Sequence, residues 1–588
     1  MLERSEARFR AIEIGLPSWA DAEPDRLAFV SNETGVWQVW TLDLATGRRD
    51  RITDEPLGVA RVLVSPDGKI VWWSDTKGDE WGRWMFTRFD AGDPTPLVPD
   101  ADEAWSSGFS LTRGRAAFGR ATEEDYAIYV VDDGQAPRLL YRHEEVAGVG
   151  RLLPEGTGGI SADGSLVCIR HSEQGDVIHP ALRVLDATSG EPVAELSDPG
   201  RALSPVAWAP SEPLLLFTSE RGDFERPAIW DPSRNERRDL DVDLPGAAIP
   251  LAWYPNGDAI VIRQEHEAID RLHRVDIHTG ETRLVADPGG EIEEAVVRPD
   301  DEVWLTVGNA SHPRRPETGD GHPLVPMPND APPGRPFRSF WFANAPGDKI
   351  QAIVMTPPGP GPFPIVIRAH GGPEWHERER WDPELQALVD AGYAVAGVNF
   401  RGSTGYGIAF RERLTENPLL ADSEDLVACL DALIEDGLAD GGQAFLFGWS
   451  WGGILACLGE GLYPDRWRAV FAGVPVGDLV EGHRAAMPLI QALNVVTFGG
   501  DPTQVPERYR ERNPMTYVDR AQAPVLVISA ENDPRCPPAA VMPWVEALRR
   551  RGVEVELHVD PGGHWLNAMD VGVRDADRIL SFFERHRA

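Results

Sequence analysis

The chain has 588 residues, with 57 Lys or Arg against 94 Asp or Glu, which gives a formal net charge of −37. Its 42% hydrophobic and 26% charged residues are typical of a folded protein and exclude a disordered or fibrous chain. This length predicts at least two domains. Because so acidic a surface repels phosphate groups, the composition argues against nucleic acid or an anionic membrane as a partner.

Cysteines and the N-terminus indicate the compartment. The chain holds four widely spaced cysteines without a CxxC pair, which predicts reduced thiols and neither a disulfide framework nor a structural zinc site. The segment up to Trp19 mixes charges and has no signal-peptide core, and no later stretch approaches the roughly 18 apolar residues of a membrane span. We therefore expect a cytoplasmic protein, with a helical segment over residues 1–20 that packs against the C-terminal domain.

The first half of the chain repeats a strand-and-turn pattern. Over residues 21–325, short strands rich in Val, Trp, Leu and Ile are separated by polar turns such as Ser65–Gly68, Ser161–Gly164 and Tyr254–Gly257. These turns recur about every 45 residues or twice that, which is the spacing of four-stranded propeller blades. The pattern predicts a seven-bladed β-propeller, and a pair of β-sandwiches is the alternative. The predicted blades begin near Leu27, Val62, Phe109, Gly159, Val206, Leu251 and Ala295.

The second half changes to a different periodicity. Six prolines between His322 and Arg338 predict a linker, and residues 326–588 form the second predicted domain. Apolar runs at 364–369, 394–398, 444–447, 525–528 and 553–557 alternate with amphipathic helical segments. This alternation predicts a doubly wound α/β domain with a mostly parallel sheet, of the α/β-hydrolase kind.

A nucleophile motif follows the third of these runs. Gly448–Gly452 has the pattern GxSxG between an apolar strand and a helical segment, which is the context of a strained elbow that presents a nucleophilic serine, here Ser450. On this fold the acid and the base follow the serine along the chain. Asp533 and His564 each follow a predicted strand in that order. A helix cap remains the alternative role of Asp533, with Glu531 as the rival acid and His558 as the rival base.

An oxyanion site completes the predicted catalytic machinery. Backbone N–H groups usually stabilise the developing oxyanion, one from the residue after the nucleophile and one from a loop at an earlier strand end. Trp451 and Gly372, in the loop His370-Gly371-Gly372-Pro373, are the predicted donors. A simple tight turn is the alternative interpretation of this loop.

The motifs together resemble one family. They are His370–Pro373, Asn399–Gly407, Gly448–Gly453, Asp533–Pro537 and Gly562–His564, and they resemble the prolyl oligopeptidase family of serine peptidases over nearly the whole chain. Asn399–Gly407 is most similar to its acylaminoacyl-peptidase branch. The resemblance implies a propeller joined to an α/β-hydrolase domain, with Ser450 as nucleophile, His564 as general base and then acid, and Asp533 as its orienting partner.

The same resemblance bears on substrate binding. Arg535 matches an arginine that holds a substrate carbonyl, and a surface ion pair is its alternative role. Trp451 stands where the family usually has Tyr, and no clear paired-glutamate segment of the dipeptidyl-peptidase kind is found, which lowers that possibility. Trp449, Val474 and Phe498 lie near the catalytic loops and predict an apolar substrate pocket, although such residues often serve packing.

The function predicted from the sequence is that of a serine peptidase. It cleaves short peptides admitted past the propeller through an acyl-enzyme at Ser450, with neither metal nor cofactor. An esterase, tailoring hydrolase or acyltransferase acting on one metabolite uses the same triad and is the main alternative. An inactive scaffold is a third possibility. The motifs define neither the exact substrate nor the oligomeric state, so a homo-oligomer remains open.

Overall fold

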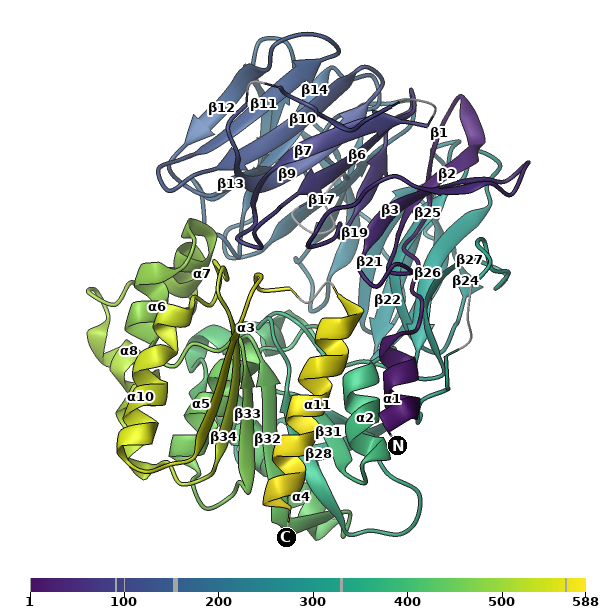
Figure 1. The fold of residues 1–588 in the computed structure, drawn as a ribbon. Coiled ribbons are helices and arrows are strands. Elements are labelled where there is room, and N and C mark those ends of the chain that lie inside the picture. Colours follow the sequence, from purple (N-terminus) through teal and green to yellow (C-terminus); the bar gives the residue numbers. More distant parts are fainter. Residues whose placement is uncertain are drawn as a thin grey trace.

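The computed structural model describes residues 2–89, 92–99, 101–151, 157–327, 331–565 and 568–587. A body of strands lies above a helix-covered sheet (Figure 1). Strands β1 to β27 build the upper body, and strands β28 to β35 build the sheet of the lower body. Among the described residues, no helix is both long and apolar enough to cross a membrane.

The upper body is a propeller of antiparallel sheets, each formed by strands that follow one another in the chain. The first sheet contains β1 (Ser18–Ala20), β2 (Glu23–Ser31), β3 (Gln38–Asp43) and β4 (Arg49–Arg51). The second contains β5 (Val62–Val64), β6 (Lys69–Ser74), β7 (Trp81–Arg88), β8 (Thr95–Pro96), β9 (Ala104–Thr112), β10 (Arg115–Ala121), β11 (Tyr126–Asp132) and β12 (Arg138–His143).

The remaining sheets of the propeller are smaller. They contain β13 (Ala147–Val149), β14 (Leu166–His171), β15 (Ala181–Asp186) and β16 (Pro192–Leu196); β17 (Leu203–Trp208), β18 (Leu215–Ser219), β19 (Arg226–Asp231) and β20 (Glu236–Asp239); β21 (Ala247–Trp253), β22 (Ala259–His266), β23 (Ile269–Asp276) and β24 (Thr282–Ala286); and β25 (Glu291–Val297), β26 (Val303–Asn309) and β27 (His312–Thr318). Alternating burial along these strands places apolar side chains between neighbouring sheets, where they form separate small cores.

One long sheet contains two of the predicted blades, those that begin near Val62 and Phe109. Strands β7 and β9 pair through Trp81 with Trp105 and through Gly82 with Ala104. A side chain at Gly82 would place its Cβ 2.1 Å from the Ser74 carbonyl oxygen, so only glycine permits this approach. The second sheet therefore runs through eight strands rather than four.

The structure corrects three details of the expected organisation. The N-terminal helix α1 (Leu2–Phe9) ends well before Trp19, which lies in β1. Leu27 lies in β2, the second strand of its sheet, because β1 precedes it. Gly159 lies between β13 and β14 rather than in a strand, because the next residue, Ile160, forms only an isolated β-bridge with Val167. The other predicted blade starts fall within strands.

The lower body has a single eight-stranded sheet, with strand order β28-β29-β31-β30-β32-β33-β34-β35. Its strands are β28 (Arg338–Ala343), β29 (Lys349–Met355), β30 (Phe363–Ala369), β31 (Ala394–Asn399), β32 (Ala439–Trp449), β33 (Ala469–Gly473), β34 (Val525–Ala530) and β35 (Val555–Asp560). From β31 to β35 all neighbours are parallel, whereas β28 and β29 pair antiparallel. Four of the five predicted runs lie within strands of this sheet, and the fifth, 553–557, overlaps the first three residues of β35.

Helices cover both faces of this sheet, so it is buried on both sides. They are α2 (Pro383–Asp390), α3 (Ile408–Glu416), α4 (Leu420–Glu435), α5 (Trp451–Leu462), α6 (Leu479–Ala485), α7 (Pro488–Phe498), α8 (Pro506–Arg512), α9 (Pro514–Tyr517), α10 (Met542–Arg550) and α11 (Met569–His586). One core includes side chains of α4, α5 and α10, and the other includes side chains of α2 and α11. This is the architecture of a doubly wound α/β domain.

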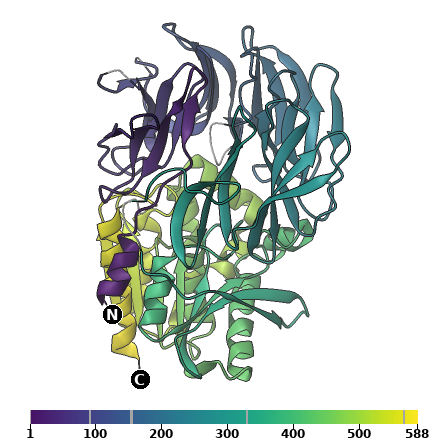
Figure 2. The same ribbon diagram turned by 90° about the vertical axis from the view of Figure 1, so that its right-hand side faces the viewer.

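The N-terminal helix lies on the lower body. Figure 2 shows α1 beside the C-terminal helix α11, and Arg8 of α1 forms an ion pair with Asp390 at the end of α2, with 2.5 Å between Nη1 and Oδ2. Arg8 also donates to the carbonyl oxygens of Pro332 and Pro333. The chain therefore begins on the α/β body before it enters the propeller.

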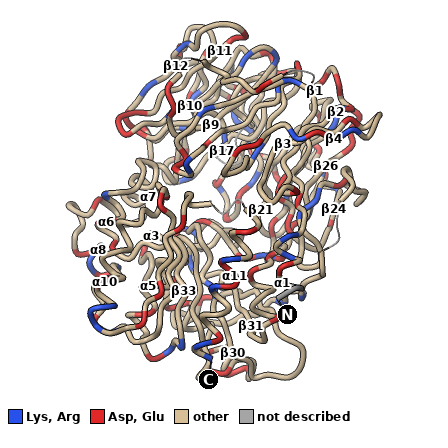
Figure 3. The backbone as a smooth tube through the Cα atoms, in the orientation of Figure 1, with Lys and Arg blue, Asp and Glu red and all other residues tan. Residues whose placement is uncertain are grey.

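Charged residues are dispersed over both bodies (Figure 3). Several buried ion pairs nevertheless join the bodies. Arg411 of α3 holds Glu220 of the propeller, and Arg378 lies 3.3 Å from Asp270. Ion pairs buried in this way fix the relative placement of the two bodies, because removing one partner leaves an uncompensated charge.

Candidate active site

The candidate site lies where parallel strands end beneath the propeller. Ser450 follows β32 directly and precedes α5, with φ 56° and ψ −118°. Residues other than glycine rarely adopt a positive φ, so the backbone of this serine is held in a strained elbow. Its N–H donates to the Gly473 carbonyl oxygen at 2.9 Å, at the end of the neighbouring strand β33. This hydrogen bond to the neighbouring strand helps to fix the position of Ser450.

The two glycines of the GxSxG pattern are required by packing. A Cβ at Gly448 would lie 2.1 Å from the Gly452 carbonyl oxygen, and a Cβ at Gly452 would lie 2.1 Å from the carbonyl oxygen of Ala369 in β30. Real Cβ atoms do not approach oxygen so closely. The elbow therefore tolerates no larger residue at either position.

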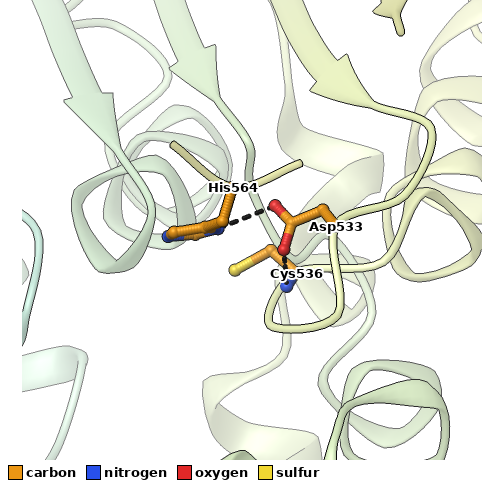
Figure 4. A group of neighbouring side chains, drawn as sticks. All are labelled: Asp533, Cys536 and His564. Atoms are coloured by element: carbon orange, nitrogen blue, oxygen red, sulfur yellow. Dashed lines mark hydrogen bonds and ion pairs between the residues drawn. The ribbon is translucent and has the colours of Figure 1, made fainter. Parts of the chain in front are cut away.

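The hydroxyl of Ser450 meets an imidazole and a carboxylate. His564 Nε2 lies 3.1 Å from Ser450 Oγ, and His564 Nδ1 lies 2.7 Å from Asp533 Oδ2. Figure 4 shows the second of these contacts between the loops after β34 and β35. The other oxygen, Asp533 Oδ1, accepts the N–H groups of Arg535 and Cys536 at 2.8 Å each. The carboxylate is therefore fixed on both sides, as an orienting acid requires.

The rival residues lie elsewhere. His558 lies within β35, and its Nε2 pairs with Glu556 Oε1 at 2.9 Å. Glu531 is exposed, and its N–H donates to the Asp560 carbonyl oxygen. The structure brings His564 and Asp533 to Ser450, and it leaves these two rivals outside the constellation.

The predicted oxyanion loop passes beside the serine. A Cβ at Gly371 would lie 3.5 Å from Ser450 Cβ, and the next residue, Gly372, has φ 125°. Trp451 is the first residue of α5, so its N–H points out of the helix N-terminus, where negative charge is favoured. Both predicted donors therefore belong to segments that adjoin Ser450.

His370 is the first residue of the predicted oxyanion loop. The imidazole is 1% exposed, stacks on Phe400 with 4.1 Å between ring centroids, and contacts Ser403 Oγ through Nε2 at 2.8 Å. Burial lowers the pKa of His370 to about 4, so the ring is neutral at pH 7. This histidine packs the loop rather than offering a charge to the site.

Two acids flank the elbow, the half-buried Glu384 and the buried Asp422, and no sequence signal singled them out. Trp449 Nε1 donates to Glu384 at 3.1 Å, and Trp451 Nε1 donates to Asp422 at 3.0 Å. Burial raises the pKa of Glu384 to about 8 and that of Asp422 to about 7. Each tryptophan beside the serine is thus fixed by one carboxyl group on its own face of the sheet.

The residues predicted to bind substrate separate into different environments. Trp449 and Val474 line a cavity of about 120 Å³ between the two bodies, but Ser450 is not among the described residues that line it. Phe498 is 2% exposed and packs on Tyr509, with 4.7 Å between ring centroids. Phe498 is therefore a core residue, and its prediction as a pocket residue is not supported. Core and pocket positions share the same residue types, so the sequence could not separate them.

Arg535 contacts the propeller. Its Nε lies 2.5 Å from Glu80 Oε1 and its Nη2 lies 2.9 Å from Oε2, while its guanidinium lies over the Trp565 ring at 4.9 Å. Asn532 donates to the Lys77 carbonyl oxygen in the same propeller loop. The loop after β6 therefore touches the segments that hold Asp533 and His564. Sequence reasoning missed this contact because it joins residues 455 positions apart.

The geometry defines a class of protein. A serine on a strained elbow, a histidine within hydrogen-bonding distance and a carboxylate behind that histidine form the arrangement that serine hydrolases share. Here it lies on an α/β-hydrolase sheet beneath a propeller.

Comparison with known proteins identifies the family of one domain of the chain. Residues 380–588 match the model of the prolyl oligopeptidase family. The chain thus carries a prolyl oligopeptidase family domain. The acylamino-acid-releasing enzyme of Mus musculus is 28% identical over 231 residues, which is 38% of this chain and 32% of that protein. The chain spans about a third of the length of the first curated relatives it matches.

Other similarities extend over the whole chain. Dipeptidyl aminopeptidase BIII of Pseudoxanthomonas mexicana is 22% identical over 571 residues, covering 92% of this chain and 76% of that protein. A crystal structure of puromycin hydrolase matches with a TM-score of 0.82 and 21% identity, covering 99% and 96% of the two chains. An acylaminoacyl peptidase of Pyrococcus horikoshii matches with a TM-score of 0.74 and 16% identity, covering 99% and 97%. At such identities the structural matches establish the fold.

Proposed function

We propose that this protein is a serine peptidase that cleaves short peptides through an acyl-enzyme at Ser450. The observation that carries the proposal is the contact of His564 with both Ser450 Oγ and Asp533, within a domain of a peptidase family. The metabolite esterase alternative is not favoured, because the curated relatives reported above have the names of peptidases. Neither a metal nor a cofactor takes part in this chemistry.

Each group has one role in the proposed reaction. Ser450 Oγ attacks the scissile carbonyl carbon while His564 Nε2 takes its proton. Asp533 keeps the imidazole in the required tautomer, and the N–H groups of Gly372 and Trp451 donate to the oxyanion. The C–N bond then breaks as His564 returns the proton to the leaving amine. Water, activated by the same imidazole, hydrolyses the acyl-enzyme.

A serine-directed phosphonate tests the nucleophile. We expect one phosphonate per chain on Ser450, and we expect Ser450→Ala to abolish labelling and lower kcat roughly 10⁶-fold while the circular dichroism spectrum is unchanged. Labelling at another residue, or retained turnover in Ser450→Ala, would refute the assignment.

The amino end of the substrate is the open part of the specificity. The acylamino-acid-releasing relatives support an acylated end, as does the similarity of Asn399–Gly407 to the acylaminoacyl branch. Puromycin hydrolase complexed with PGG is also among the structures that match this fold. The charges on the propeller side of the oxyanion loop favour a second candidate, a peptide with a free amino end.

Around Arg411, on the propeller side of the predicted oxyanion loop, carboxylates outnumber cations. Arg411 is shared among Glu220 at 2.8 Å, Glu374 at 3.6 Å and Glu225 at 3.9 Å. Burial raises the pKa of Glu225 to about 7, and Glu225 Oε2 has no hydrogen-bond partner among the described residues. The side chain of Glu374 is 41% exposed, so it is open to a ligand. An ammonium group would relieve this excess of negative charge.

Glu374 is close enough to the serine to meet the amino end. It lies three residues after Gly371, which adjoins Ser450, and three residues extend over at most about 11 Å. A free α-amino group one or two residues before the scissile bond falls within this range. Glu374 is therefore the group we expect to distinguish free from acylated amino ends.

Matched chromogenic peptides decide between the two candidates. Each carries Pro, Ala, Leu or Phe before the leaving group and has either a free or an acetylated amino end. Turnover of the acetylated set supports the acylaminoacyl or oligopeptidase activity. A need for the free amine, together with a KM that rises at least roughly tenfold in Glu374→Gln, supports the second candidate, since one such contact contributes about 1.4 kcal/mol or more. If no peptide is cleaved while Ser450 still labels, the peptidase proposal is wrong.

We infer a specific architecture for this activity. Counting β5–β8 and β9–β12 as separate blades, joined by the short β7–β9 pairing, gives a seven-bladed propeller. The proposed boundaries are residues 1–20 for a segment docked on the hydrolase domain, 21–325 for the propeller and 326–588 for the hydrolase domain. The ion pair of Arg8 with Asp390 supports the docking. The propeller then restricts access to short peptides, and the cytoplasm is the proposed location.

A further inference from the structure

A thiol lies beside the histidine and the carboxylate of the candidate triad. Figure 4 shows Cys536 next to Asp533 and His564. One ligand atom from each of these residues lies within 4.8 Å of the others. Cys536 is 6% exposed and Asp533 is 3% exposed, and the N–H of Cys536 donates to Asp533 Oδ1 at 2.8 Å. The thiol is therefore held in place next to the reacting groups.

The three donors have the chemistry of a zinc site. Thiolate sulfur, imidazole nitrogen and carboxylate oxygen are the ligands that Zn²⁺ prefers, and three protein ligands leave a fourth position for water. The thiolate also selects soft cations over Mg²⁺ or Ca²⁺. Among the described residues, no other group of three His, Cys, Asp or Glu side chains comes together in this way.

We propose that Cys536, His564 and Asp533 form an inhibitory binding site for Zn²⁺ or a similarly soft divalent cation. Binding exchanges the thiol proton of Cys536 for a sulfur–metal bond and releases that proton to solvent.

Metal binding at this position stops the proposed reaction directly. The Nδ1 of His564 and the Oδ2 of Asp533 are 2.7 Å apart and are joined by the hydrogen bond that orients the imidazole. A cation bound by both residues replaces that hydrogen bond, and the proton on Nδ1 moves to Nε2 as the ring changes tautomer. Nε2 then no longer has a free lone pair for the Ser450 proton, so the imidazole cannot act as a base. The metal is thus an inhibitor, and removing it restores the arrangement seen here.

The inference rests on the proposed function only for its effect on turnover, so binding is measured separately. Cd²⁺ is titrated into the full chain carrying Ser450→Ala, and the ultraviolet absorption of a thiolate–cadmium bond is followed. We expect one bound Cd²⁺ per chain. Adding Cys536→Val should remove the band. Cys168→Ala, which changes a buried propeller thiol, serves as the control and should retain it.

Inhibition is measured on chains with an intact Ser450. We expect Zn²⁺ to inhibit peptide cleavage reversibly, with recovery after EDTA, and the inhibition constant to rise roughly 10- to 100-fold in Cys536→Val or Cys536→Ala. Each variant is compared with its own rate in the absence of metal, and its fold is checked by circular dichroism. Unchanged inhibition in both variants, or no thiolate band in the Ser450→Ala chain, overturns the proposal. If no peptide is cleaved, the band alone decides about the metal site.

Discussion

The turn acids of the propeller and two acids beside Ser450 in the α/β domain are held in opposite ways. In the propeller, Asp43, Asp186 and Asp276 end equivalent strands and accept N–H groups from residues two or three positions later. These backbone hydrogen bonds lower the pKa of each carboxyl group. In the α/β domain, burial raises the pKa of Glu384 to about 8 and that of Asp422 to about 7.

This difference in pKa shows that the acidic residues responsible for the net charge of −37 include two populations. The turn acids of the propeller stabilise local turns and stay charged in water. Glu384 and Asp422 of the α/β domain fix tryptophans beside the serine and resist ionisation. Asp533 combines both features, because it is 3% exposed yet accepts two backbone N–H groups. The acid proposed to orient His564 is thus buried without losing its hydrogen-bond partners.

The largest effect among the acids is expected at Asp533. Asp533→Asn places an amide where His564 Nδ1 needs an acceptor, so the imidazole adopts the wrong tautomer and kcat falls roughly 10⁴-fold. Steady-state kinetics with the best chromogenic peptide measures the loss, and the urea unfolding midpoint checks the fold. Asp560→Asn, at the end of the next strand, is the control and should retain far more activity. A kcat within tenfold of the original would remove Asp533 from the proposed triad.

The second-largest effect is a loss of stability, expected when a buried carboxylate loses its cationic partner. Arg411 is buried between the bodies and compensates Glu220, so Arg411→Met leaves that buried carboxylate without its partner. Breaking a buried ion pair costs about 3–5 kcal/mol, whereas an exposed pair contributes about 1 kcal/mol or less. Arg466→Met, which removes a more exposed pair with Asp431, is the matched control. Urea unfolding should show the larger loss for Arg411→Met, and equal losses would contradict the buried-pair argument.

The sequence alone identifies the features that depend on local pattern and on chain order. The strand before Ser450, the glycines of its elbow and the order Ser450, Asp533, His564 follow from spacing, because parallel strands bring their carboxyl ends to one edge of the sheet. The repeated turns of the propeller follow from the positions of Asp and Gly in the same way. These features required no knowledge of contacts between distant segments.

Contacts between distant segments could not be predicted. Glu80 meets Arg535, and Glu220 meets Arg411, only because the two bodies come together. Glu384 and Asp422 resemble surface acids of amphipathic helices, and nothing in their neighbours shows that each receives an indole N–H. Phe498 is a residue type that is common in apolar pockets, but it lies in the core. Residue type is the same in both cases, so only the packed structure separates them.

A smaller effect is expected from the pH dependence of stability. Burial raises the pKa of Asp422 to about 7 in the folded protein, and the ordinary pKa of an Asp is 3.8. Between these values the folded state binds a proton that the unfolded state has lost, so stability falls as pH rises through this window and is constant above it. Asp422→Asn removes this contribution, which is on the order of a few kcal/mol.

Urea unfolding from pH 5 to pH 8 measures that contribution. The difference between the two chains should change in favour of Asp422→Asn as pH rises, since the amide oxygen can still accept from Trp451 Nε1. Asp440→Asn, at an exposed position, should show no such trend. A constant difference across this range would mean that Asp422 ionises normally in the folded protein.

The smallest effect is expected in the propeller turns. Asp186 accepts the N–H groups of Thr188 and Ser189 at 2.9 and 2.7 Å, but these hydrogen bonds are exposed to solvent, so water replaces the carboxylate as acceptor in Asp186→Ala. We expect a slight fall in the thermal unfolding midpoint, less than for Arg411→Met, with no change in kcat. Asp186→Asn retains an acceptor oxygen and should lie between the two chains. A loss as large as that of Arg411→Met would mean that the turn acids fix the blades rather than only their loops, and the contrast between the two populations of acids would then fail.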